Sequence, residues 1–392
     1  MSFKTVKLLD ISKPKQWKNL PSSELTQEGY FVYGANGIIG KYTEYNHEFP
    51  TLVITCRGAT CGSLHITKPK SYINSNAMAL DNLSDDVNIK YLYYSLFNRG
   101  FKDVITGSAQ PQITREGLSK IKIPLPPLQD QIRIAEILTQ AENLITQRKE
   151  SILLLDELLK STFLEMFGDK LEETSQLEHL GDNISYLTSG SRGWAKHYSD
   201  SGAKFLRIQN IGGGIIRTDN LIFVNPPNSA ETGRTRVKEG DLIISITADL
   251  GRTSVVPKNF GEAYINQHLA LIRLNENINP IYAAYFYNMP FGNNAIQKKN
   301  RSAVKAGLNF NDIRSFPIII PKMIRQNQFA LIVEKIETLK TDYQASLKEL
   351  ENMYGVLSQK AFKYELQIDI KKSDKITKEL NSEDFNIEKY II

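Results

Sequence analysis

The sequence predicts an α+β fold in which two globular α/β domains are joined by two long antiparallel coiled-coil helices, with an internal pseudo-two-fold repeat. The first observation is that residues 121–167 match the residues 195 positions later without a gap, so that Pro126 corresponds to Pro321 and Gln131 to Gln326. A repeat of this length is a duplicated module and not a solenoid period. The second observation is that both copies have helical periodicity. The third is that a β-like block precedes each copy.

Each copy of the repeat is predicted to form a long helix. In the second copy, apolar residues recur every seven positions, as in a coiled-coil seam; they are Phe329, Ile336, Tyr343, Leu350 and Leu357. Proline is tolerated at a helix start and disfavoured inside, so residues 123–127 and 317–321 are expected to mark the junctions. Because both copies lie on one chain, we expect the helices to pair with each other rather than in a homodimer.

The first helix carries a second apolar stripe beside its seam, formed by Leu138, Ile145, Ile152 and Leu159. A stripe wider than a strict seam predicts contact with more than one neighbour. These residues are therefore candidates for binding a partner protein.

These junctions divide the chain into five segments. We expect globular domains at residues 1–125 and 171–320, long helices at 126–170 and 321–365, and a charged C-terminal tail at 366–392. A chain of 392 residues is long enough for domains with separate cores. Its net charge of +5 permits nucleic acid as a partner without requiring it.

The composition predicts a cytoplasmic protein without a membrane segment. No apolar run approaches the roughly 18 residues of a membrane span. The only cysteines are Cys56 and Cys61, which are too few for a disulfide framework and lack the ligand number of a zinc site.

The two β-like blocks are weaker copies of each other. The run TLVITCRGATCG at 51–62 aligns with DLIISITADLG at 241–251, and Asn74-Ser75-Asn76 aligns with Asn266-Gln267-His268. A shared apolar frame with different polar residues is expected of two readers of different targets. Drift of surface loops after duplication is the alternative explanation.

We predict no catalytic residues and no metal site. The Asn-Pro-Pro sequence at 225–227 lacks the aromatic residue that would stack on a flipped-out base. Gly212-Gly213-Gly214 lacks the spacing of a nucleotide-binding loop and is expected to form a turn. The five histidines form no metal-spaced pair.

The remaining polar residues are suited to DNA. Lysine and arginine neutralise phosphates, whereas asparagine, glutamine and arginine read base edges. The candidates are Lys41, Arg57, Thr60, Asn74, Asn76, Arg99, Gln110 and Gln112 in the first block, and Arg207, Gln209, Asn210, Arg252, Gln267, His268, Lys298, Arg301 and Lys305 in the third.

One motif links the chain to a known family. Pro126-Pro127-Leu128-x-Asp130-Gln131-x-x-Ile134-Ala135 recurs in weaker form as Pro321-Lys322-Met323-x-Arg325-Gln326-x-x-Phe329-Ala330. A variable domain that ends in this motif, continues into a long helix and is then repeated resembles the specificity subunit of type I restriction–modification systems. The resemblance covers about residues 1–365.

The resemblance implies two target recognition domains, each reading one half of a bipartite, asymmetric site in double-stranded DNA, with the helices setting the spacer. It implies two methyltransferase subunits that use S-adenosylmethionine, restriction subunits that use ATP and Mg, and no cofactor in this chain. Gln131 and Gln326 of the repeated motif become further candidates for partner binding.

Three other functions remain open at this point. They are a self-contained methyltransferase, a coiled-coil adaptor without DNA contacts, and the specificity subunit of a type IIB-like system in which methylation and cleavage share one partner. The sequence does not separate the last from a type I subunit.

Overall fold

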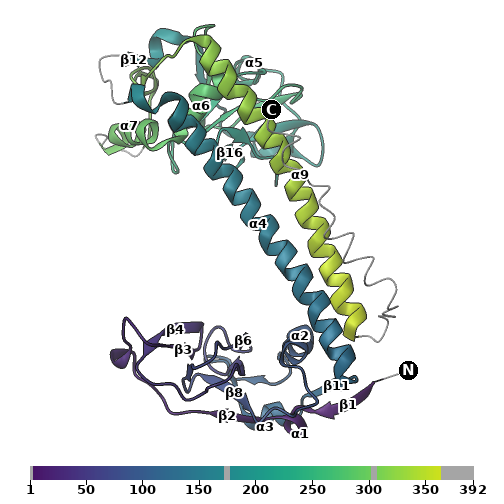
Figure 1. Cartoon of the computed structure of the whole chain (residues 1–392). Coiled ribbons are helices and arrows are strands. Elements are labelled where there is room, and N and C mark those ends of the chain that lie inside the picture. Colours follow the sequence, from purple (N-terminus) through teal and green to yellow (C-terminus); the bar gives the residue numbers. More distant parts are fainter. Residues whose placement is uncertain (1–2, 172–176, 302–306, 363–392) are drawn as a thin grey trace. The chain divides into compact units, whose positions relative to one another are not determined.

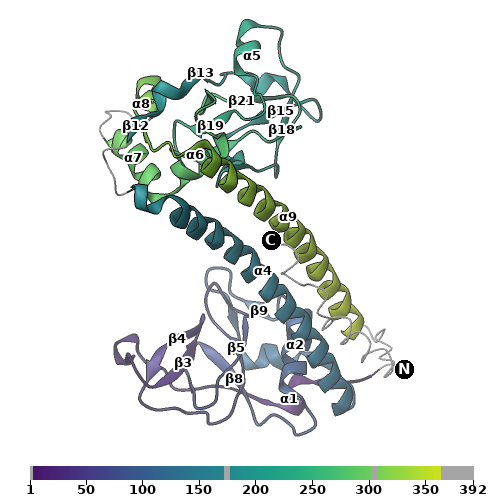
Figure 2. The ribbon, with the colours of Figure 1, turned by 45° about the horizontal axis from the view of Figure 1, so that its top comes forward.

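A computed structural model of the chain describes residues 3–171, 177–301 and 307–362. The chain divides into two compact units: unit 1 comprises Met1–Lys149 with Ser346–Ile392, and unit 2 comprises Glu150–Ala345. The two long helices are α4 (Leu128–Leu171) and α9 (Met323–Phe362), so each unit contains a part of both. Figures 1 and 2 show these helices side by side.

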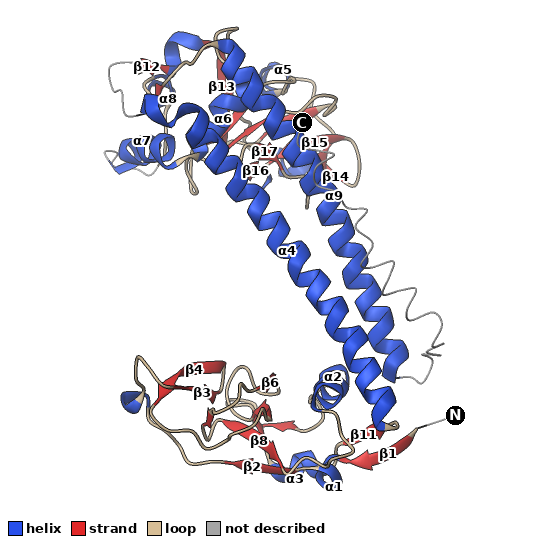
Figure 3. Ribbon diagram, in the orientation of Figure 1, coloured by secondary structure: helices blue, strands red, loops and turns tan. Residues whose placement is uncertain are grey.

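Unit 1 places short strands and small helices before α4, as Figure 3 shows by colour. Its strands are β1 (Lys4–Lys7), β2 (Lys13–Gln16), β3 (Tyr30–Gly34), β4 (Gly37–Tyr42), β5 (Leu52–Thr55), β6 (Leu64–Ile66), β7 (Tyr72–Ile73), β8 (Ala77–Asp81), β9 (Ile105–Thr106), β10 (Gln112–Ile113) and β11 (Lys122–Leu125). Its other helices are α1 (Leu8–Ile11), α2 (Ile89–Arg99) and α3 (Arg115–Ser119).

Unit 2 has a comparable set of elements between α4 and α9. Its longer strands are β13 (Ile184–Ser189), β15 (Ala203–Leu206), β18 (Ile222–Val224), β19 (Leu242–Ser245), β20 (Thr253–Val255), β21 (Ala263–Ile265) and β22 (Leu269–Leu274). Two-residue strands are β12 (Glu178–His179), β14 (Tyr198–Ser199), β16 (Ile211–Gly212), β17 (Ile215–Ile216) and β23 (Pro317–Ile318). The helices are α5 (Ala230–Thr235), α6 (Pro280–Asn288), α7 (Pro290–Arg301) and α8 (Phe310–Arg314).

The two units share one strand topology. A four-stranded sheet has the order β2-β8-β5-β6 in unit 1 and β13-β22-β19-β20 in unit 2. Its central register is also the same, because Thr55 pairs with Ala77 and Ser245 pairs with Leu269. A parallel pair accompanies each sheet, β3 with β7 in unit 1 and β15 with β21 in unit 2. The duplication predicted from the helices therefore extends to the β-rich domains.

The central strands β5 and β19 are rich in apolar residues because both of their faces are buried. Every residue of β5 and every residue of β19 is buried, as expected for runs of β-branched and apolar residues. The main apolar cluster of unit 2 joins its sheet to α6 and to the long helices, and includes Phe163, Tyr282 and Phe329. The helix α6 begins at Pro280 after Asn279, whose side chain accepts a hydrogen bond from the Ile281 N–H.

The long helices are antiparallel within each unit. In unit 1, Tyr354 Oη donates to Glu142 Oε1 at 3.0 Å, and Lys149 lies 2.9 Å from Glu351, so the numbering of α9 falls as that of α4 rises. In unit 2, Lys340 Nζ lies 2.7 Å from Asp156 Oδ1, and the ring centroids of Phe163 and Phe329 are 5.3 Å apart, so the numbering again runs in opposite directions. The predicted antiparallel pairing is confirmed in both units.

The helices lie close to their expected ranges. The structure has Leu128–Leu171 and Met323–Phe362 where the sequence predicts 126–170 and 321–365. Each begins just after the last proline of its junction, where an N–H is not needed for the helix. The expected tail at 366–392 lies outside the described residues.

Candidate nucleic-acid interface

One end of the four-stranded sheet gathers polar candidates in unit 1. The Cys56 N–H donates to the Asn76 carbonyl at 3.0 Å, which places the end of β5 beside the start of β8. The Ile113 N–H donates to the Cys56 carbonyl at 3.0 Å, and Arg57 forms a β-bridge with Gln112. Three candidates from distant positions, Arg57, Asn76 and Gln112, therefore meet at this sheet end.

Unit 2 repeats this backbone frame with other side chains. The Ile246 N–H donates to the His268 carbonyl at 2.9 Å, and the Leu308 N–H donates to the Ile246 carbonyl at 2.9 Å. Thr247 and His268 accordingly occupy the places of Arg57 and Asn76. His268 Nδ1 lies 2.6 Å from Thr247 Oγ1, and its Nε2 lies 3.1 Å from Gln267 Nε2. The two sheet ends differ in the hydrogen-bonding groups that they present.

Several DNA candidates of the two units are open to solvent. Arg57, Gln110 and Gln112 are exposed, as is Gln209 in unit 2. The half-buried candidates are Lys41, Thr60 and Asn76 in unit 1, and Gln267 and His268 in unit 2. Among these, His268 is held by Thr247 and Thr60 by the Ala35 carbonyl, and a fixed orientation favours specific recognition.

Asn74 and Asn210 are corrections to the DNA candidates, because both are enclosed in their own units. Asn74 is 3% exposed, and its amide bonds both the N–H and the carbonyl of Leu20 at 3.2 and 2.9 Å. Asn210 is fully buried and accepts from the Arg207 N–H at 3.0 Å. Their amides satisfy buried backbone groups, a structural role that leaves no group for a base.

Two arginine candidates are already paired with carboxylates. Arg99 holds both oxygens of Asp103 at 3.0 and 2.6 Å, and this hydrogen bonding lowers the pKa of the Asp103 carboxyl. Arg252 is paired with Asp249. A third arginine, Arg207, donates to the Asn220 carbonyl at 2.8 Å.

The basic cluster after α7 is only partly described. Lys298 is exposed on α7, and Arg301 is the last residue of that helix. Lys305 lies outside the described residues.

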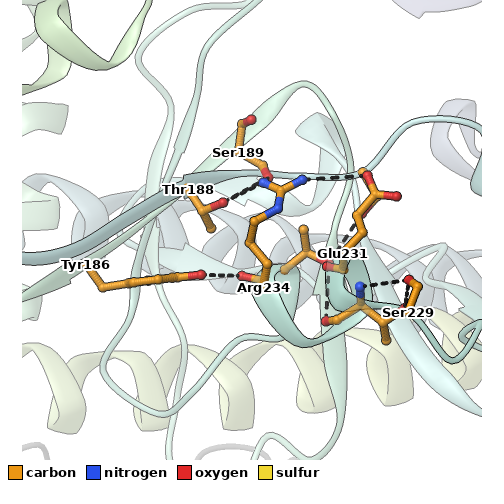
Figure 4. A network of polar contacts seen from close by, with 9 residues as sticks. Tyr186, Thr188, Ser189, Ser229, Glu231 and Arg234 are labelled. Carbon is orange, nitrogen blue, oxygen red and sulfur yellow. Dashed lines mark hydrogen bonds and ion pairs between the residues drawn. The ribbon is translucent and has the colours of Figure 1, made fainter.

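Arg234 at the sheet end of unit 2 was missed by sequence reasoning. Its Nη1 donates to Thr188 Oγ1 at 2.6 Å and to the Ser189 carbonyl at 2.7 Å, so α5 is attached to the end of β13 (Figure 4). Tyr186 Oη donates to the Arg234 carbonyl at 2.9 Å from the same strand. The Arg234 side chain remains 42% exposed, and its Nη2 lies 3.6 Å from Glu231 Oε1. No signal in the sequence points to it, because α5 has no counterpart in the first block.

The helical partner candidates are largely buried. Gln131 and Gln326 are fully enclosed, and Leu138 and Leu159 are 1% and 2% exposed in the apolar clusters of units 1 and 2. These four residues are corrections, because they pack inside the chain and offer no surface to a partner. Ile145 and Ile152 are half-buried.

The apolar surface of α4 lies beside the predicted stripe. Leu153, Leu154, Leu158 and Leu164 are 64%, 60%, 47% and 50% exposed. Large exposed apolar side chains grouped on one helix indicate an interaction surface. The sequence indicates this surface in part, since Leu153, Leu154 and Leu164 have the polar repeat counterparts Lys348, Glu349 and Gln359.

Among the described residues, the long helices and the charged side chains bear on the class of protein. No helix among them is long and apolar enough to cross a membrane. No group of three or more histidine, cysteine, aspartate or glutamate side chains in that part of the chain could hold a metal ion.

The fold and the two sheet ends define a duplicated recognition protein, in which one scaffold presents two different polar surfaces. The family described as Type I restriction modification DNA specificity domain matches residues 2–154 and 202–352. The chain belongs to this family.

Known proteins agree with that assignment. The chain is 25% identical over 244 residues to the type I restriction enzyme MjaVIII specificity subunit of Methanocaldococcus jannaschii, covering 56% of this chain and 57% of that subunit. It is 24% identical over 322 residues to a putative type I restriction enzyme specificity subunit of Haemophilus influenzae, covering 78% and 80%. The match thus spans little more than half the length of the MjaVIII subunit.

A solved structure shows the same fold. The type I restriction–modification system S subunit from M. genitalium has a TM-score of 0.64 with this chain, at 18% identity, covering 92% of this chain and 96% of that one.

Proposed function

We propose that this chain is the DNA-binding specificity subunit of a type I restriction–modification complex. Each unit reads one half of a bipartite, asymmetric site, and α4 and α9 set the spacer between the halves. The carrying observation is the repeated backbone frame at the two sheet ends, which is filled by Arg57 and Asn76 in unit 1 and by Thr247 and His268 in unit 2. Different donors and acceptors on one frame select different base edges.

The chain directs the chemistry of its partners and carries none itself. We propose that two adenine-N6 methyltransferase subunits bind it and supply S-adenosylmethionine, and that restriction subunits supply ATP and Mg. The exposed leucines of α4 support such docking, because apolar side chains at 47–64% exposure gain free energy when a partner removes them from water. We also propose that the complex acts in the cytoplasm.

The test is to co-express this chain with its cognate methyltransferase subunit and to map N6-methyladenine across the host genome. Two different short words around a fixed gap, methylated on opposite strands, are the expected result. A soluble complex that methylates nothing new, or methylates without a split word, would contradict the proposal.

A variant sharpens this test. His268→Ala should reduce the base specificity in one half of the recognised site only, since His268 lies at the sheet end of unit 2. Lys335→Ala, at an exposed position of α9 that is not among the polar candidates, is the matched control and should leave both words unchanged. Relaxation of both words by His268→Ala would show that the units do not read independently.

A further inference from the structure

Unit 2 contains a polar cavity of about 340 Å³. One wall is the turn between β16 and β17, with Gly212 and Gly213, and a second is the turn between β19 and β20, with Asp249 and Arg252. Arg217 and the amide side chains of Asn288, Asn293 and Gln297 complete the lining.

The glycine turn brings open backbone to the cavity. Gly212, Gly213 and Gly214 have φ values of +146°, +69° and +86°, which glycine adopts without strain. The Gly212 N–H donates to Ser254 Oγ at 2.8 Å, which anchors the turn to β20. A side chain at Gly213 would meet no atom within 4 Å, so the backbone at this residue faces open space. A ligand can therefore approach the main chain closely.

The charge of the lining favours an anion. Arg217 is exposed, and no carboxylate in the described parts of the chain lies within ion-pair distance of it. Arg252 contacts Asp249 through Nε and Nη2. Two guanidinium groups and one carboxylate therefore line the cavity, which leaves the lining with a net positive charge. Guanidinium groups and backbone amides are the groups that bind phosphate oxygens.

The amide wall is rigid and polar. Gln297 Nε2 donates to the Leu250 carbonyl at 3.1 Å, and Asn288 Nδ2 donates to the Ala284 carbonyl at 2.8 Å. The Gln297 bond fixes α7 to the β19–β20 turn, and a second bond from Asn288 Nδ2, to the Thr253 carbonyl at 3.3 Å, fixes α6 to β20. The lining contains no aromatic ring on which a base could stack. The cavity thus suits one small anionic group rather than a nucleobase.

The cavity adjoins the sheet end that carries Thr247 and His268. Ser245, the last residue of β19, accepts from the Arg252 N–H at 2.9 Å and donates to the Asp249 carbonyl at 2.5 Å. The turn that carries Arg252 therefore begins at the same strand end as Thr247. A group bound in the cavity would lie next to the groups that read bases.

We propose that this cavity is a phosphodiester clamp, in which Arg217, Arg252 and the Gly213 backbone hold one backbone phosphate of DNA beside the word read by unit 2. This inference rests on the proposed DNA-binding function. The clamp belongs to unit 2 alone, because the repeat aligns Gly62 with Gly251 and thus places Ser63 where unit 2 has Arg252. Phosphate contacts position a protein on DNA without reading sequence.

The test measures DNA affinity of the complete methyltransferase–specificity complex against salt concentration. Arg217→Gln should lower the slope of log affinity against log salt by about 0.9, the value for one lost phosphate contact. It should weaken specific and non-specific DNA by the same factor. Arg217→Lys keeps the charge and should retain most of the slope, and Lys335→Ala should match the wild type. A thermal melt establishes that each variant is folded.

A chemical probe locates the phosphate. Single phosphates are replaced by uncharged methylphosphonates along one strand of the site. One replacement should weaken the wild type and have no further effect on Arg217→Gln. Equal losses in both proteins at every position would overturn the clamp.

Other outcomes separate the clamp from the proposed function. A complex that binds DNA without sequence preference, yet shows the Arg217-dependent slope, would overturn the proposed function and keep the clamp. Sequence-specific binding with an unchanged slope in Arg217→Gln would overturn the clamp and keep the proposed function. Inorganic phosphate that binds at Arg217 by ³¹P NMR, with DNA affinity unaffected by Arg217→Gln, would assign the cavity to free phosphate and overturn the clamp.

Discussion

Gln131 of α4 and Gln326 of α9 make the same three hydrogen bonds in their respective units. Gln131 accepts from the Asn88 N–H at 2.8 Å and donates to the carbonyls of Asp86 and Pro126 at 2.8 and 2.9 Å. Gln326 accepts from the Asn279 N–H at 2.8 Å and donates to the carbonyls of Asn277 and Pro321 at 3.1 and 2.8 Å. Each glutamine thus joins the start of a long helix to the domain before it.

Gln131→Leu should destabilise unit 1 by about 3 kcal/mol. The substitution leaves one buried N–H and two carbonyls without their partner, and each unsatisfied buried group costs roughly 1–3 kcal/mol. The free energy of unfolding in urea measures the effect. Gln129→Leu, at an exposed position of the same helix start, is the control and should change stability little. Equal unfolding free energies for both variants would contradict this role.

The contact between Glu142 and Tyr354 should fix α9 against α4 in unit 1. Glu142 accepts from Tyr94 at 2.8 Å and from Tyr354 at 3.0 Å. A double-mutant cycle of Tyr354→Phe and Glu142→Gln should give a coupling free energy of about 1 kcal/mol, as for a hydrogen bond to a charged group that is partly solvated. Additive effects of the two changes would show that the bond contributes nothing.

Stability should fall at alkaline pH because of the tyrosines around α6. Burial raises the pKa of Tyr282, Tyr285 and Tyr287, and Glu337 adds to the effect at Tyr285. An unfolded tyrosine loses its proton at about pH 10. The folded state keeps the proton to higher pH, so its stabilisation is complete below about pH 10 and is lost as the pH rises further.

The urea midpoint, measured from about pH 8 to about pH 11, checks this expectation. Tyr287→Phe removes one of the raised groups and should make the alkaline decline shallower than in the wild type. A urea midpoint that stays constant over this pH range would show that the raised tyrosine pKa values do not affect stability.

Replacing residues 1–125 by the corresponding domain of another specificity subunit should change one half of the recognised site. Unit 1 presents Arg57 and Asn76 at a sheet end of its own, with no residue of unit 2 among the described contacts of that frame. Mapping N6-methyladenine in cells that contain the hybrid identifies the sequences of both half-sites in one experiment. A changed word on both sides of the gap is the outcome that rejects independent reading.

Charging the leucine surface of α4 should prevent binding of the methyltransferase. Leu154→Lys changes a side chain that is 60% exposed, so the fold should persist while co-purification is lost. Ile145→Lys is the matched comparison at a half-buried position, where loss of helix packing is expected as well. An intact complex with Leu154→Lys and Leu158→Lys together would exclude this surface.

The sequence by itself determined the duplication, the two long helices and the family. Those features depend on local signals: the proline junctions stop one element and start another, and the seven-residue period of Phe329, Ile336 and Tyr343 requires a helix. In the structure Phe329 is fully buried, and Ile336 and Tyr343 are 8% and 9% exposed, in agreement with a packed seam.

Only the tertiary structure decided which polar and apolar side chains are available to a ligand. Asn74 and Asn76 look equivalent in sequence, yet Asn74 is bonded to Leu20 across 54 positions and Asn76 stands at the sheet end beside Arg57. Likewise, Leu159 is buried and Leu158 is exposed, since the neighbours of a helix come from distant parts of the chain. Burial is a property of contacts between remote segments, which the local pattern of residues does not specify.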